Sequence, residues 1–168
     1  MSFEELARTR YSVRKFEPRP IEASVMRKLL EMGALAPTGC NKQPQRIYVL
    51  QSEEARAKAA ECSPCTFNAP AVLLVCYDRD AAWHRDFDGY DCGEFDASIV
   101  VTHLTLAAVE LGLGTCIVAY FDPDKTRSLF NLPPSVVPMA MLPVGYPAAQ
   151  PSPMHAKRNS YTDYTTIL

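Results

Sequence analysis

The sequence lacks the features of a membrane-spanning or nucleic-acid-binding chain. Its 168 residues contain no apolar run that approaches the length of a membrane span. The first residues, Met-Ser-Phe-Glu-Glu-Leu, are acidic and amphipathic, which is unlike a signal peptide, so a cytoplasmic protein is expected. The net charge is −2, which gives no general attraction to nucleic acid or to anionic lipid. Any bound anion must therefore be held by a local cluster of cations.

Common catalytic and nucleotide-binding motifs are absent as well. The chain has no G-x-G-x-x-G, no P-loop, no H-E-x-x-H and no G-x-S-x-G. These absences disfavour a Rossmann dinucleotide site, a zinc hydrolase and a serine hydrolase of the common kind. There are no repeats or low-complexity blocks, and 48% hydrophobic with 21% charged residues is ordinary for a globular protein. We expect a single domain over residues 1–168.

The six cysteines favour neither a disulfide framework nor a metal site. Cys76 and Cys116 lie in apolar runs and are predicted to be small core residues. Cys62 and Cys65 form a C-x-x-C, but a zinc site would need a second pair at suitable spacing. A thioredoxin-like motif should follow a strand, whereas this one follows a helical pattern. A small metal or thiol-redox protein built on this pair is therefore the least favoured hypothesis.

The stretch Arg10–Phe16 packs two arginines, a lysine and a serine into seven residues. If its backbone is extended, Arg10, Ser12 and Arg14 face the same side, because side chains alternate along a strand. Two guanidinium groups and a hydroxyl suit a phosphate. The alternative is a basic surface turn. Lys15 has the opposite parity and is expected in solvent.

A polar segment, residues 36–45, connects a predicted helix to a predicted strand. Thr38, Asn41 and Gln43 can donate and accept hydrogen bonds at once, as recognition of a heterocycle edge requires. A plain helix-to-strand connection is the alternative. The length of the segment favours a binding role over that alternative.

Hydrophobic patterning predicts an alternation of helices and strands. Helices are expected from Phe3, over 21–34, over 52–61, over 95–113 and from about 123, and strands over 46–50, 71–77, 115–120 and 138–144. The helix over 95–113, with Asp96 as its N-terminal cap, is apolar almost all round and is predicted to be buried, either in a larger core or against a second subunit. A chain of 168 residues has a limited interior, which favours a dimer interface. The tail over 148–168 is rich in Pro and Ser and is predicted to be either loose or docked.

Three stretches together resemble the nitroreductase family of FMN-dependent oxidoreductases. Arg10–Phe16 resembles the family's opening R-x-S-x-R/K, and residues 36–44 are similar to its A-P-S-x-x-N-x-Q-P loop. The third stretch runs from Asp96 to Cys116 and continues to Pro147. No single piece is specific, but the ordered set is, and it spans nearly the whole chain.

The resemblance implies an α+β homodimer with a central mixed β-sheet flanked by helices. The long apolar helix would lie at the subunit interface, and the tail would reach the partner subunit. Two FMN molecules would sit at the interface, each touched by both chains. NADH or NADPH would reduce the flavin, leave, and be replaced by a nitroaromatic, quinone or related acceptor in a ping-pong mechanism. A flavin-binding carrier or redox sensor of the same fold, without turnover, is the alternative.

The resemblance also implies which residues bind the cofactor. Arg10 and Ser12 would hold the FMN phosphate, with Arg158 and Lys157 from the tail. Arg14 would place a fixed cation near N1 and O2 of the flavin, which favours its reduced anionic form. The flavin carries the chemistry, so no catalytic side chain and no metal are assigned. The full set of implied contacts is Arg10, Tyr11, Ser12, Arg14, Pro37, Thr38, Gly39, Asn41, Gln43, Asn68, Ile117, Val118, Ala119, Lys157 and Arg158.

Two departures from the family pattern concern substrate choice. Gln45 stands where an aromatic residue often follows Q-P, so a stacking wall is expected to be missing or different. The chain is also short, so the elements that cover the flavin in longer members are expected to be trimmed, or replaced by residues 78–90.

Overall fold

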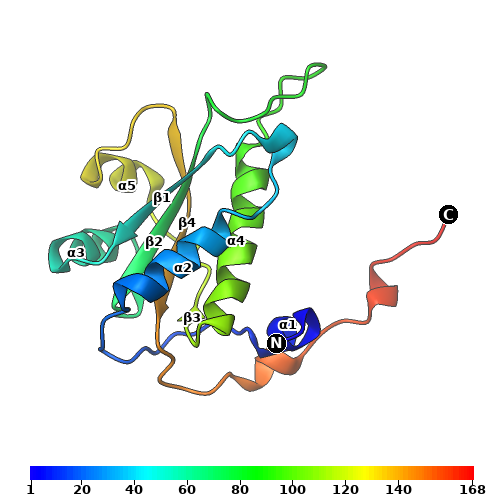
Figure 1. Ribbon diagram of the computed structural model, residues 1–168. Helices are drawn as coiled ribbons and strands as arrows, with labels where there is room; N and C mark the ends of the chain where they lie inside the picture. Colours follow the sequence, from blue (N-terminus) through cyan, green and yellow to red (C-terminus); the bar gives the residue numbers. More distant parts are fainter.

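A computed structural model describes residues 1–168, and at its centre lies a four-stranded sheet (Figure 1). All strand ladders in this sheet are antiparallel. The strands, in the order in which they lie side by side, are β1 (Gln45–Leu50), β2 (Ala71–Asp78), β4 (Val136–Gly145) and β3 (Gly114–Thr115). The helices are α1 (Phe3–Thr9), α2 (Ala23–Gly33), α3 (Glu53–Cys62), α4 (Gly93–Glu110) and α5 (Pro123–Leu129). No helix combines the length and the hydropathy that a membrane crossing needs.

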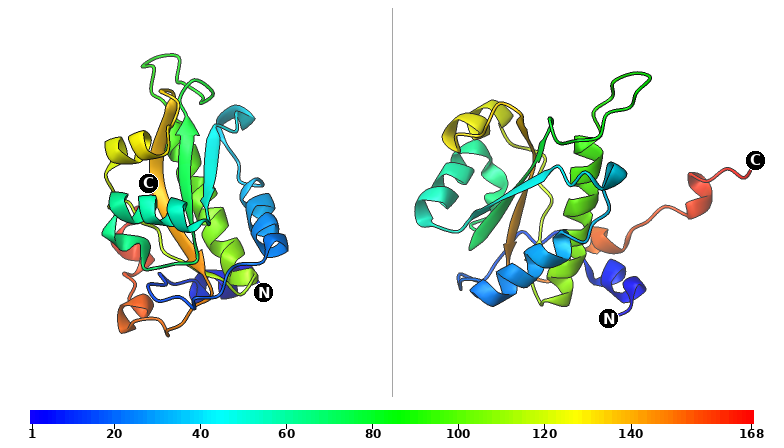
Figure 2. Two further views of the ribbon diagram at one scale, coloured as in Figure 1. Left: turned by 90° about the vertical axis from the view of Figure 1, so that its left-hand side faces the viewer. Right: turned by 45° about the horizontal axis from the view of Figure 1, so that its top comes forward.

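Strand β2 is buried on both faces, as its continuous apolar run predicts. Leu73 and Val75 point toward α2 and α4, in a core with Leu29 and Leu104. Val72, Leu74 and Cys76 alternate with them and point to the opposite face. Helices α3 and α5 cover this second face (Figure 2). The sheet therefore carries one hydrophobic core on each side.

A mixed sheet is expected, and parallel pairing occurs only at one edge of the observed sheet, beside β3. Ser12 forms a parallel bridge with Thr115, and the N–H of Val13 donates to the Thr115 carbonyl over 2.9 Å. Phe16 then forms an antiparallel bridge with Pro147. The basic stretch Arg10–Phe16 thus lies against the sheet edge as an extended segment, although it forms no regular strand.

Capping residues in the sequence predicted most of the helix starts correctly. Ser2 and Glu5 form the predicted capping box of α1, and Ser52 and Asp122 cap α3 and α5. The predicted cap of α4 is wrong: the helix begins at Gly93, so Asp96 lies inside its first turn. The predicted strand over 115–120 is also too long, because β3 ends at Thr115.

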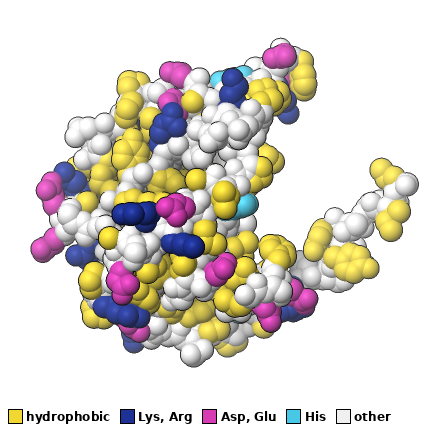
Figure 3. Space-filling model, in the orientation of Figure 1, with side chains coloured by type: hydrophobic (Ala, Val, Ile, Leu, Met, Phe, Trp, Pro, Cys, Tyr) yellow, Lys and Arg dark blue, Asp and Glu magenta, His cyan; other side chains and the backbone are white.

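The tail leaves the body of the molecule beside α1 and projects away from it (Figures 1 and 3). It contains two short 3-10 turns, η3 (Pro153–Ala156) and η4 (Tyr161–Asp163). Of residues 148–168, His155 alone is not exposed. The tail forms no strand within this chain. At the opposite end of α4, residues 79–92 form a second excursion that stands clear of the body (Figure 2).

Candidate functional site

The basic stretch owes its orientation to Val13. This side chain is 2% exposed and packs against Gly114, so its neighbours Ser12 and Arg14 are turned away from the core. Arg10, Ser12 and Arg14 line one pocket of about 210 Å³, together with Tyr11. The side-chain parity predicted from the sequence is therefore confirmed. Two guanidinium groups and a hydroxyl that converge on a small cavity form an anion-binding arrangement.

The tail supplies the other wall of this pocket. Its lining residues there are Ser152, Met154, His155 and Arg158, whereas Lys157 is not among them. Sequence reasoning found Arg158 but missed Ser152 and His155. No motif marks these two residues, since only the path of the tail across α1 brings them to the pocket.

The loop between α2 and β1 lies at the other end of α4. The N–H of Gly39 donates to Oδ1 of Asp96 over 2.8 Å, in the first turn of α4. Pro37, Thr38 and Gly39 line a second pocket, of about 330 Å³, with Asp96. The 18 residues of α4 span roughly 27 Å, at about 1.5 Å per residue. One chain therefore does not bring this loop to the pocket of Arg10.

This loop has an unusual backbone. Cys40, Asn41 and Gln43 all have positive φ (47°, 55° and 51°), which costs a side-chain-bearing residue about 1 kcal/mol each. The Gln43 N–H donates to Thr38 Oγ1 over 3.0 Å, which holds the turn closed. Asn41 and Gln43 are exposed, so their side chains remain available to a ligand.

Two buried oxygens beside the loop have no hydrogen-bond donor in this chain: Oδ2 of Asp96 and Oε1 of Gln45. Buried acceptors are nearly always paired in folded proteins. Asp96 is 1% exposed, and only its Oδ1 is satisfied, by Gly39. Unpaired acceptors of this kind are typical of sites that a ligand or a partner completes. Gln45, in the position of the expected aromatic residue, therefore presents a polar oxygen there in place of a stacking ring.

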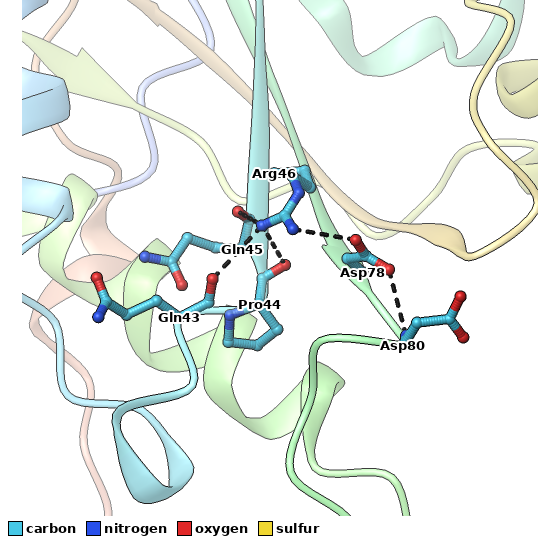
Figure 4. A network of polar contacts seen from close by, with 6 residues as sticks. All are labelled: Gln43, Pro44, Gln45, Arg46, Asp78 and Asp80. Carbon is cyan, nitrogen blue, oxygen red and sulfur yellow. Dashed lines mark hydrogen bonds and ion pairs between the residues drawn. The ribbon is translucent and has the colours of Figure 1, made fainter.

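Arg46 fixes the exit of the loop onto the sheet (Figure 4). Its Nη1 donates to the carbonyls of Pro44 and Gln45 over 3.3 and 3.0 Å, and its Nη2 contacts Asp78 Oδ2 over 3.0 Å. The guanidinium group thereby ties β1 to the end of β2. Figure 4 also shows Asp78 accepting the backbone N–H of Asp80, at the start of the 79–92 excursion.

Replacing Arg46 with leucine is expected to lower the free energy of unfolding by about 1 kcal/mol, because the carbonyls of Gln43, Pro44 and Gln45 lose a shared donor while the half-exposed ion pair contributes little. Urea denaturation measures the change. Arg79→Leu is the matched control, since Arg79 only pairs with Asp91, over 3.4 Å, and is more exposed. An equal loss in both variants would contradict a role for the carbonyl contacts.

The segment that follows β3 presents backbone donors beside the basic pocket. Its first residue, Cys116, lies next to Ser12 and Arg14. Val118 is buried and exchanges hydrogen bonds with Met141, both over 2.9 Å. Ile117 and Ala119 are exposed, and their N–H groups have no acceptor within the chain. These two donors are available to a ligand.

Asn68 is a predicted FMN contact that lies apart from both the Arg10 pocket and the pocket of the loop over residues 36–44. It lines a pocket against α3, with Glu53 and Arg56, and not the pocket of Arg10. Its φ of 51° identifies it as a turn residue between η2 (Pro64–Thr66) and β2. Within one chain, Asn68 is therefore a turn residue before β2, and its contact with FMN stays a prediction.

All six cysteines are free. Burial raises the pKa of the Cys76 thiol to about 12, and burial also raises the pKa of Cys116. Cys62 ends α3 and is buried in the core, and no three His, Cys, Asp or Glu side chains gather in a way that could hold a metal ion. Within the C-x-x-C, Cys62 is therefore a core residue, whereas Cys65 is only partly buried.

The rate at which each thiol reacts should follow its exposure and the shift of its pKa. A raised pKa leaves a smaller fraction of thiolate at pH 8, so Cys76 and Cys116 are expected to react with an aromatic disulfide reagent only after unfolding. Cys40 is exposed and is expected to react first. Stopped-flow absorbance measures the phases, and Cys40→Ser should remove the fastest one. A fast phase that survives this substitution would contradict the assignment.

The fold and the pockets define an α+β protein with a cationic pocket of about 210 Å³ at its sheet edge. The nitroreductase family model matches residues 7–64 and 62–146. The chain therefore belongs to the nitroreductase family, whose fold it shares, and is an oxidoreductase of that family.

Individual relatives agree with this assignment. A nitroreductase family protein from Clostridium difficile is 39% identical, with a TM-score of 0.93 over 99% of this chain and 98% of that one. The FMN reductase [NAD(P)H] of Bacillus subtilis is 28% identical over 82% of this chain and 62% of its own. A protein from Exiguobacterium sibiricum solved in complex with FMN is 21% identical, with a TM-score of 0.88 over 100% and 98% of the two chains, and so shares the fold.

Proposed function

We propose that this protein is an FMN-dependent oxidoreductase that uses NADH or NADPH to reduce nitroaromatic, quinone or related acceptors by a ping-pong mechanism. The observation that carries the proposal is the pocket in which Arg10, Ser12 and Arg14 converge with Arg158. Its donors suit the phosphate group of FMN. Relatives of this chain are named for FMN and NAD(P)H, or were solved with FMN, which supports the same cofactor here.

The residues around the pocket fit the rest of the cofactor. Arg10 and Ser12 would bind the phosphate, while Arg14 would stabilise negative charge at the pyrimidine end of the ring. The free N–H groups of Ile117 and Ala119 would donate to polar atoms of the ring edge. When bound, FMN would supply the transfer of hydride from NAD(P)H and of electrons to the acceptor. The side chains would bind and orient, and none is assigned an acid or base role.

A second subunit would complete the site. Helix α4 leaves Phe95, Ile99, Leu106 and Val109 partly or fully exposed, an apolar stripe at helical spacing. Antiparallel packing of two α4 helices about a two-fold axis would bring the loop over residues 36–44 of one chain to the Arg10 pocket of the other. Thr38, Asn41 and Gln43 would then contact the same FMN as the partner's basic pocket.

The shape of the chain supports this dimer. In Figure 3 the excursion over residues 79–92 and the tail both stand clear of the body, on the side of α4, with an open recess between them. The tail exposes Tyr161, Tyr164, Ile167 and Leu168, each at least 69% accessible. Isolated chains rarely expose so many large apolar side chains in one segment. We infer that residues 1–168 form one domain and that its tail, residues 148–168, docks on the partner subunit.

The excursion over residues 79–92 would cover the acceptor site. Its exposed tip carries Phe87 and Tyr90, and Arg85 stacks against both rings at 5.3 and 4.5 Å. Bidentate pairing with Asp88 fixes Arg85 in place. A planar aromatic acceptor, such as a nitroarene or a quinone, is the kind of molecule that such a surface would select.

The visible spectrum of the purified protein tests the proposal. A flavin absorption band, bleached on anaerobic addition of NADH or NADPH and restored by a quinone, is expected. A bound flavin that neither nucleotide bleaches would indicate the alternative, a carrier or redox sensor without turnover. A protein that binds no FMN at all would overturn the proposal.

A further inference from the structure

The tail forms one wall of the basic pocket, yet almost nothing holds it there. Every residue over 148–168 is exposed apart from His155. Ser152, Met154, His155 and Arg158 all line the pocket with Arg10 and Ser12. A segment with so little buried surface needs a specific contact to keep it in position.

His155 makes that contact. Its Nε2 lies 2.8 Å from the Arg8 carbonyl, in the last turn of α1, and its ring meets Tyr11 edge-on with centroids 6.0 Å apart. Tyr11 in turn donates its hydroxyl to the Ala149 carbonyl over 2.6 Å. The Ala148 N–H also donates to the Lys15 carbonyl over 2.9 Å, so the tail is held at Ala148 and Ala149 before Ser152 and at His155 after it.

The contact to α1 does not depend on the charge of His155. A carbonyl oxygen only accepts, so Nε2 must carry the hydrogen, in the neutral ring as well as in the imidazolium. The charged groups that line the same two pockets as His155 are Glu4 and Arg8 of α1, Arg10 and Arg14 of the basic stretch, and Arg158 of the tail. The contact should hold across the physiological pH range.

We propose that His155 is a positioning residue that latches the tail over the phosphate site, where it holds Ser152 as an additional phosphate ligand beside Arg158. The latch rests on the proposed function, because the ligand is the phosphate of FMN. Ser152 precedes η3, and its hydroxyl makes no capping hydrogen bond there. Arg158 donates through Nη1 to the carbonyls of His155 and Lys157, which leaves Nε and Nη2 free.

This arrangement couples the tail to the phosphate and not to the flavin ring. Phosphate in the pocket would pull Ser152 and Arg158 toward Arg10, and a docked tail would in turn hold the phosphate. Riboflavin, which carries the same ring without the phosphate, would not engage the latch. Comparison of the two flavins therefore isolates the effect of His155.

Fluorescence titration of flavin-free protein with FMN and with riboflavin tests the latch. His155→Ala should weaken FMN binding roughly tenfold and leave riboflavin binding unchanged, because it removes a donor that orders charged phosphate ligands. His155→Gln retains an N–H donor and should recover most of the loss. Lys28→Ala is the control, since Lys28 is exposed on α2 and does not line the basic pocket.

Limited trypsin digestion adds a readout of the tail itself. FMN should slow cleavage after Lys157 and Arg158 at least severalfold in the wild type, riboflavin should not, and His155→Ala should abolish the protection. Unchanged FMN affinity in His155→Ala, or equal losses for both flavins, would overturn the latch while leaving the proposed function intact. A wild-type protein that binds neither flavin would instead overturn the proposed function.

Discussion

Replacing Arg10 and Ser12 together with alanine should leave the purified protein without bound FMN. Both side chains line the same pocket, and each would donate to an ionised phosphate oxygen. Hydrogen bonds to charged groups contribute about 1.5–3 kcal/mol each, so the pair should contribute at least about 3 kcal/mol, or roughly a hundredfold in the dissociation constant. The ratio of flavin to protein absorbance after gel filtration measures the loss.

Lys15→Ala is the matched control for this double replacement. Lys15 belongs to the same basic stretch, but its side chain is exposed and does not line the pocket. Its removal should leave flavin content unchanged although it removes a positive charge nearby. Thermal melting should show that both proteins remain folded, since neither Arg10 nor Ser12 is a core residue. Full retention of FMN in the double variant would refute the phosphate site.

Replacing Gly114 with alanine should destabilise the protein by about 3 kcal/mol, as overpacking of a rigid site does. A Cβ at this position would lie 2.3 Å from Cγ2 of Val13 and 3.0 Å from Cγ of Pro147. Val13 has no room to retreat, because it is 2% exposed and its N–H is bonded to Thr115. The clash would push the basic stretch off the sheet edge, and FMN binding should weaken with it.

A double-mutant cycle separates this steric effect from general destabilisation. Val13→Ala removes the atom that the new methyl group meets. The Gly114→Ala, Val13→Ala double variant should therefore be more stable than the sum of the single effects predicts, by at least about 1 kcal/mol. Urea denaturation of the four proteins gives the coupling energy. A coupling energy near zero would show that the contact between the two positions is not what requires glycine.

The sequence by itself determined the features that short-range rules govern. A continuous run of seven apolar residues is typical of a strand buried on both faces, and β2 is one. Ser2, Ser52 and Asp122 cap helices because their side chains reach a backbone N–H three residues on. The alternation of an extended segment likewise placed Ser12 and Arg14 on the side opposite the buried Val13.

Some local signals were outweighed by tertiary contacts. Asp96 has the chemistry of a helix cap, but α4 starts three residues earlier and Asp96 binds the Gly39 N–H from a distant loop. The apolar pattern over 115–120 predicts a strand, yet regular pairing ends at Thr115, and beyond it only single contacts of Cys116 and Val118 reach β4. In both cases a partner far along the sequence decided the outcome.

Only the tertiary structure decided how the candidate site is distributed. The sequence suggested one set of contacts, but α4 holds the loop over residues 36–44 and the Arg10 pocket at its opposite ends within one chain. Ser152 and His155 reach the pocket only because the tail crosses α1. Capping, alternation and burial act over a few residues and can be predicted from local sequence. The distance between two functional segments depends on how a whole helix packs, and no local pattern records it.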